Sequence, residues 1–185
     1  MRLEPIDKPK GFMMRLAFWM ARRQFGKVLT PMKVLYPRMP GGLKLSYEIQ
    51  KFETNGLHLD PGLHLMIGTL VSDINGCSFC VDISRALAIR KHVGLEKFNA
   101  LCDYRTSPLF SAQERAALRY VEEATRQKHV SDPTFAELRK YFSENQIVEI
   151  TWLNAVHNYY NLINIPLEIE SDGLCAIAQT EMVPT

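Results

Sequence analysis

Apolar residues recur at the spacing of α-helices along almost the whole chain of 185 residues, and this pattern constrains the fold most. In residues 61–74, for example, the apolar side chains follow the i, i+3, i+4, i+7 pattern that places them on one helix face. No segment alternates between apolar and polar residues for long enough to indicate a β-strand. The sequence therefore predicts a compact all-α domain of about seven or eight helices.

Two kinds of motif predict where helices begin. One is Asp followed by Pro, an N-cap residue with a proline in the first turn. The other is the capping box, in which Ser is followed three residues later by Glu or Gln. The four predicted starts are Asp60-Pro61, Ser111 to Glu114, Asp132-Pro133 and Ser143 to Gln146. Gly56 is expected to end a helix over residues 43–55, and Pro166 to stop the long helix that runs from Ser143 to residue 163.

The chain is long enough for one sizeable core, and no Ser/Gly/Pro-rich or like-charge linker divides it. We expect residues 1–40 to form an N-terminal helix and a Pro-rich connector that pack on the domain or on a neighbouring subunit. Residues 41–170 are expected to form the helical domain, and residues 171–185 a C-terminal tail. The apolar run at residues 12–21 is too short to span a bilayer and lacks a cleavage site, so we expect no export and no membrane partner.

Charge and cysteine content narrow the function classes. The formal net charge is only +2, with 22 basic and 20 acidic residues spread along the chain, so a nucleic-acid partner is not expected. Four cysteines do not make a secreted disulfide scaffold, because only Cys77 and Cys80 are close in sequence. Cys102 and Cys175 are interpreted as isolated buried or tail thiols. A cytoplasmic location fits this usage best.

Cys77 and Cys80 form a Cys-x-x-Cys pair where one predicted helix ends and another begins. On one helix face, two such cysteines can form a disulfide or act in turn as attacking and resolving thiols. A helix N-terminus favours the thiolate, and Cys77, the more N-terminal residue, benefits most. A thioredoxin-like site needs a preceding strand, and a structural zinc needs two more suitably spaced ligands; neither is present, so no metal or cofactor is expected. Two buried cysteines without any chemistry remain the alternative.

The segments 75–82, 104–118 and 143–151, with the spacing of Asn158 and Asn161, resemble the carboxymuconolactone decarboxylase superfamily on its alkylhydroperoxidase D-like branch. The resemblance covers roughly residues 43–166. It implies an all-α subunit that forms homo-oligomers and a peroxidase that uses an external dithiol or redox-protein reductant. By the same resemblance, Cys80 would attack the hydroperoxide and Cys77 would then form a disulfide with the oxidised Cys80. This assignment reverses the one that the helix dipole favours. Burial and neighbouring groups can affect the pKa of a thiol more than the helix dipole does.

The chain departs from the family at the proton relay. The Glu that lies twelve residues before the first cysteine in the family is Leu65 here, and the His four residues after the second is Ser84. Ser84 can donate a hydrogen bond to the Cys80 thiolate but cannot act as a base. His157, which has polar neighbours on the long C-terminal helix, is the preferred substitute; Glu48 has weaker grounds.

These observations predict a thiol-dependent antioxidant protein that reduces hydroperoxides or exchanges disulfides through Cys77 and Cys80. An alternative is a non-catalytic binding or stress-response scaffold of the same fold. Decarboxylation of a lactone acid is the third possibility, but its only basis is the family name, and that reaction does not depend on a dithiol. His58 and His64 have no third ligand nearby in the sequence, so no metal site is expected there.

Overall fold

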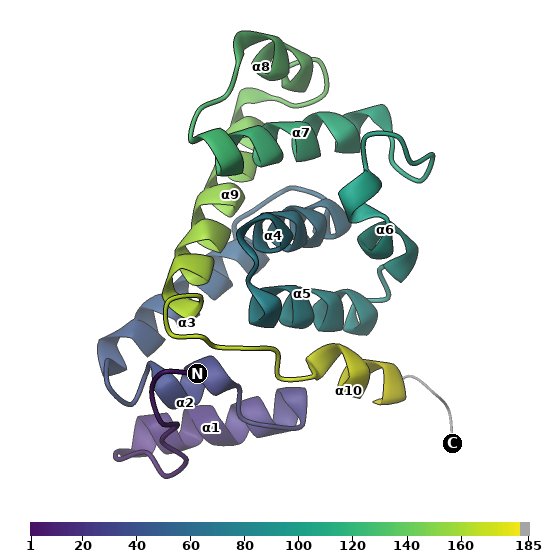
Figure 1. Cartoon of the computed structure of the whole chain (residues 1–185). Coiled ribbons are helices and arrows are strands. Elements are labelled where there is room, and N and C mark those ends of the chain that lie inside the picture. The colour runs from purple at the N-terminus through teal and green to yellow at the C-terminus, as the bar shows by residue number, and fades with distance from the viewer. Residues whose placement is uncertain (182–185) are drawn as a thin grey trace.

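Residues 1–181 are described by the computed structural model, and this part of the chain is helical without any β-strand. The all-α prediction is thereby confirmed. Helix α4 (Pro61–Asn75) runs through the middle of the molecule and contacts α5 (Ser78–Arg90), α7 (Ala112–Gln127) and α9 (Glu144–Asn164) (Figure 1). Every residue of α4 from 65 to 72 is buried, as expected for a helix that neighbours surround.

Shorter and peripheral helices complete the fold. They are α1 (Phe12–Phe25), α2 (Thr30–Val34), α3 (Pro40–Asn55), α6 (Leu95–Asn99), the 3-10 helix η1 (Leu101–Asp103), α8 (Asp132–Leu138) and α10 (Leu174–Glu181). The described residues thus form ten α-helices rather than seven or eight, and the two unforeseen ones are α2 and α10. Sequence analysis had assigned these segments to a connector and a tail, because neither is long enough to show a helical period by itself.

Three of the four predicted helix starts are confirmed. The Asp60 carboxylate accepts a hydrogen bond from the backbone N–H of Leu63, and Ser111 and Ser143 each form a complete capping box. The fourth prediction is wrong by one residue, since Ser131 is the N-cap residue of α8 and Asp132 is already helical. Pro133 therefore occupies the second helical position, where a missing N–H costs no intrahelical hydrogen bond.

The core has a central part between α4, α7 and α9, and a second part beneath α5 that contains both cysteines of the Cys-x-x-Cys pair. Phe25 at the end of α1 and Leu174 in α10 belong to this second cluster, so α1 and α10 both pack against the part of the core that holds the cysteines (Figure 1). Residues 174–181 are hence part of the domain. None of the helices within residues 1–181 has the length and apolar character needed to cross a membrane.

Candidate functional site

The Cys-x-x-Cys pair lies at the start of α5, as the sequence predicts. Gly76 adopts a left-handed conformation (φ 74°) that ends α4 and turns the chain at once into the next helix. Cys77 is the N-cap residue of α5, and its N–H donates to the carbonyl oxygen of Ser72 over 2.9 Å. Cys80 follows in the first turn, 5.3 Å away between Cα atoms, and the two sulfurs form a disulfide.

Cys80 faces the interior, where it meets the last residue of α9. The side chain is 5% exposed, and Nδ2 of Asn164 donates a hydrogen bond to its sulfur over 3.4 Å. Sequence analysis did not single out Asn164. The available signal was the stripe of asparagines at 154, 158, 161 and 164, whose spacing puts them on one face of α9. That stripe faces the buried cysteine and α4.

Amide hydrogen bonds from this stripe fix α9 against the end of α4. Nδ2 of Asn75 donates to the side-chain oxygens of Asn158 and Asn161, over 3.0 and 2.9 Å. Asn161 in turn donates to the Ser72 hydroxyl over 3.2 Å. Since Ser72 also accepts the N–H of Cys77, the network holds the turn that carries the first cysteine.

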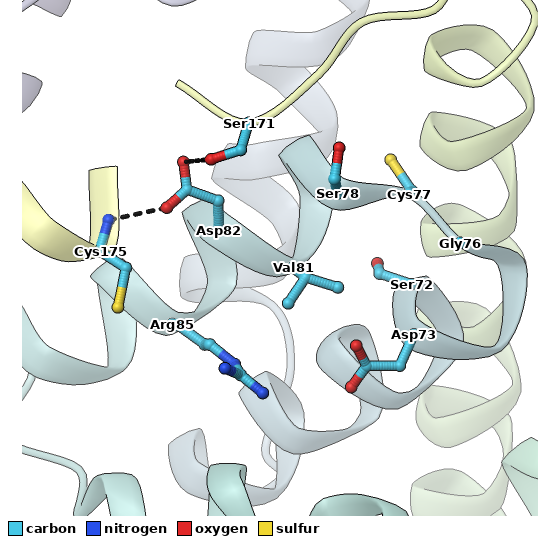
Figure 2. A pocket seen from close by; sticks show the side chains of 10 residues that line it. All are labelled: Ser72, Asp73, Gly76, Cys77, Ser78, Val81, Asp82, Arg85, Ser171 and Cys175. Atoms are coloured by element: carbon cyan, nitrogen blue, oxygen red, sulfur yellow. Dashed lines mark hydrogen bonds between the residues drawn. The ribbon is translucent and has the colours of Figure 1, made fainter. Parts of the chain in front are cut away.

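Cys77 lines a surface pocket of about 410 Å³, although the residue itself is only 1% exposed (Figure 2). Asp73, Arg85 and Cys175 line the same pocket. Burial raises the pKa of the Asp73 carboxyl, which the Arg85 guanidinium partly offsets. Burial, followed by the nearby Asp82 carboxylate, also raises the pKa of the Cys175 thiol. The fourth cysteine, Cys102, is exposed and does not line this pocket.

Asp82 in α5 contacts the C-terminal segment of the chain. Its buried carboxylate accepts hydrogen bonds from the Ser171 hydroxyl and from the backbone N–H groups of Asp172, Leu174 and Cys175, over 2.8 to 3.1 Å (Figure 2). These donors surround the N-terminus of α10. Asp82 thus joins the C-terminal helix to α5 next to the cysteines.

Among residues 1–181, neither Ser84 nor His157 forms a hydrogen bond to a sulfur of the dithiol. Ser84 is buried, 5% exposed, and within residues 1–181 its hydroxyl makes no hydrogen bond to Cys80. His157 precedes Asn164 by seven residues, about 10 Å along α9, and lies over Gly68 instead. Asn164, which is a hydrogen-bond donor and not a base, occupies the place beside the Cys80 sulfur.

Comparison with known proteins defines the class to which this fold and cysteine pair belong. The sequence profile of the carboxymuconolactone decarboxylase family matches residues 50–123. The chain is also 31% identical over 181 residues to the uncharacterized protein YnjA of Escherichia coli (strain K12), covering 97% of this chain and 98% of YnjA. The chain belongs to the carboxymuconolactone decarboxylase family, on its alkylhydroperoxidase D-like side.

Particular relatives extend this assignment. The uncharacterized protein YdfG of Bacillus subtilis (strain 168) is 26% identical over 134 residues, which are 71% of this chain and 90% of YdfG. ATU0492 from Agrobacterium tumefaciens is a protein of unknown function described as a candidate antioxidant defence protein AhpD. Its crystal structure superposes on this chain with a TM-score of 0.69 and 27% sequence identity. The match covers 74% of this chain and 94% of the ATU0492 chain. The debrominase Bmp8, in complex with 2,3,4-tribromopyrrole, shares the fold over 99% of this chain and 98% of its own, with a TM-score of 0.82 and 20% identity.

Proposed function

We propose that this protein is a thiol-dependent antioxidant enzyme that reduces hydroperoxides through the Cys77–Cys80 dithiol. The observation that carries the proposal is the position of the pair: both residues lie at the N-terminus of α5, with the Asn164 amide on the sulfur of Cys80. A helix N-terminus and an N–H donor both stabilise a thiolate, which is the nucleophilic form of cysteine. The fold shared with ATU0492 agrees with this role.

The reaction would consume one dithiol per hydroperoxide. The Cys80 thiolate attacks the terminal oxygen of ROOH, the O–O bond breaks, and RO⁻ leaves and takes a proton to become the alcohol. Cys80 becomes a sulfenic acid. The Cys77 thiol then attacks the Cys80 sulfur, a disulfide forms, and water leaves. An external dithiol or redox protein reduces this disulfide and is itself oxidised.

The two cysteines have different neighbours, which supports separate roles for them in the reaction. Both residues are buried, but Cys77 lines the surface pocket, whereas Cys80 is held against Asn164. A reductant that enters the pocket therefore meets Cys77 first, and its attack there releases the Cys80 thiolate. We further propose a cytoplasmic location, as the cysteine usage indicates, and a homo-oligomeric assembly, as the family resemblance implies.

The pocket also indicates a class of reductant. Arg85 lines it beside Cys77, and its buried Nε has no hydrogen-bond partner within the described chain. A guanidinium with a free donor binds a carboxylate well. We expect reductants that carry a carboxylate to reduce the Cys77–Cys80 disulfide faster than neutral ones, and Arg85→Gln to remove this preference. Arg119→Gln, which changes an exposed arginine of α7, is the matched control.

The deciding experiment measures hydroperoxide consumption by the reduced protein with a dithiol donor, with intact mass recorded after each turnover. Wild type is expected to consume peroxide and to lose the mass of two hydrogens. Cys80→Ser should abolish consumption, and Cys77→Ser should stop at a Cys80 sulfenic acid, one oxygen heavier. Cys102→Ser, which changes an exposed cysteine, should behave as wild type.

Two outcomes contradict the proposal. If peroxide leaves Cys77 and Cys80 reduced, the pair is not a peroxidase centre, and the non-catalytic scaffold becomes the better description. If consumption persists in Cys80→Ser and disappears in Cys77→Ser, the attacking thiol is the one that the helix dipole favours, and the assigned roles are reversed.

A further inference from the structure

A second cluster of polar side chains lies between helices α3, α4 and α9, at the other end of α4 from the cysteines. It consists of Glu53, His64 and His157, one residue from each helix. Each offers one ligand atom, and these three atoms lie within 4.8 Å of one another. His64 is eight residues before Ser72, about 12 Å along α4, so the cluster is separate from the dithiol pocket.

The cluster lacks the hydrogen bonds that normally accompany buried polar atoms. Oε1 of Glu53 and Nε2 of His157 are both buried, and neither has a partner among residues 1–181. An unpartnered buried polar group costs folding free energy, and a bound ion is one of the explanations for two such groups that lie close together. The His64 and His157 rings meet edge to face, with centroids 6.3 Å apart, and this leaves their nitrogens free to turn toward Glu53.

Helix α4 makes room for this arrangement. A Cβ atom at position 68 would overlap the ring of His157, so only glycine lets the imidazole lie against the backbone of α4. His64 precedes Gly68 by one helical turn and projects from the same face. The ring of His157 therefore approaches His64 because residue 68 has no side chain.

We propose that Glu53, His64 and His157 bind a divalent transition-metal ion of the zinc type. Two imidazole nitrogens and one carboxylate oxygen are a donor set that Zn²⁺ takes readily, with water as the fourth ligand. Around a tetrahedral zinc the ligand atoms are about 3.4 Å apart, so the side chains need to close the present separations, which are at most 4.8 Å, by little more than an ångström. Sequence analysis expected no third ligand near His64; the structure supplies two, from helices distant in sequence.

The electrostatic state of the cluster suits a metal. Burial raises the pKa of the Glu53 carboxyl to about 7. Burial, followed by the Lys91 ammonium, lowers the pKa of His64 to about 4. Burial and then His64 lower the pKa of His157 to about 3, so both imidazoles are neutral at physiological pH and have a free lone pair. A divalent cation would displace the proton from Glu53 and stabilise its carboxylate.

The test uses the full chain with its disulfide formed, because reduced Cys77 and Cys80 could themselves bind zinc. The protein is first treated with a chelator, and Zn²⁺ is then titrated against a chromophoric competitor. We expect one Zn²⁺ per chain and a zinc-dependent rise in Tm. Glu53→Gln and His64→Gln should each weaken binding at least tenfold and abolish the Tm rise. His58→Gln, which changes an exposed histidine bound to Glu149, should leave both unchanged.

X-ray absorption and a variant without the two cysteines distinguish zinc at this site from zinc at the dithiol. X-ray absorption should show two imidazoles and no sulfur around the zinc, and the Cys77→Ser/Cys80→Ser double variant should bind zinc as the wild type does. The proposal is overturned if the oxidised protein binds no zinc, if Glu53→Gln and His64→Gln bind as tightly as wild type, or if binding requires reduced cysteines. His157→Gln is not relied on, because that ring also packs on Gly68. Peroxide reduction is measured separately, so failure of either proposal leaves the other intact.

Discussion

Asn164, the last residue of α9, donates its side-chain N–H to the sulfur of Cys80 in the first turn of α5, over 3.4 Å. The two residues are far apart in sequence, and the contact is buried. In the family the proton relay involves a histidine and a glutamate, whose positions are Ser84 and Leu65 here. The amide of Asn164 stabilises a thiolate once formed but takes no proton from it.

Replacement of Asn164 by alanine should therefore slow the reaction of Cys80 without removing it. A hydrogen bond of this kind contributes about 1 kcal/mol, so we expect alkylation of reduced Cys80 at neutral pH to slow by about three- to tenfold. The rate is measured by mass spectrometry with iodoacetamide. Asn158→Ala is the control, because its amide bonds Asn75 and Asn154 and not the cysteine. Equal rates in Asn164→Ala and wild type would show that the contact does not activate Cys80.

Asp82→Asn should destabilise the C-terminal helix. The Asp82 carboxylate accepts four hydrogen bonds at the start of α10, and an amide can accept only through its one oxygen. We expect a loss of about 1 to 3 kcal/mol in urea unfolding, and faster amide hydrogen exchange in α10 than in α4. Asp132→Asn in the first turn of α8 is the matched surface control and should cost much less. Unchanged exchange in α10 would contradict the role assigned to Asp82.

Gly68→Ala should be destabilising although alanine is the better helix former. The added methyl group would overlap the His157 ring, and such overpacking costs about 1 to 3 kcal/mol. Gly41→Ala in α3 is the control, since a Cβ there meets nothing within 4 Å, and its stability should be equal to or slightly above wild type. In a His157→Ala background, Gly68→Ala should cost less. An equal cost in both backgrounds would place the strain elsewhere.

Asp73→Asn should stabilise the protein at neutral pH. Burial raises the pKa of this carboxyl in the folded state, with Arg85 opposing, so the folded protein favours the protonated form. Burial of the ionised Asp73 carboxylate destabilises the folded protein. This destabilisation is absent below the pKa that Asp73 has in the unfolded chain and complete above the pKa that it has in the folded chain. The gain in urea stability should therefore be largest near pH 7 and shrink as the pH falls toward about 4. A gain that is independent of pH would exclude burial of the charge as its cause. Asp103→Asn, at an exposed position, should follow wild type throughout.

The helical frame and the position of the cysteine pair followed from local sequence. The capping boxes at Ser111 and Ser143 and the Asp60 cap depend on residues within four positions of each other, and they appear in the structure as predicted. The start of α8 was misplaced by one residue, because a proline is compatible with either of the first two helical positions.

Which polar side chains meet between helices was decided by tertiary structure alone. The Asn164–Cys80 hydrogen bond, the Asp82 cap on α10 and the assembly of Glu53, His64 and His157 each join helices that are distant in the chain. Periodicity shows which face of a helix is apolar, but it does not show which polar residue of one helix will meet a given residue of another. That choice depends on how the helices cross around α4, where the absence of a side chain at Gly68 admits the His157 ring.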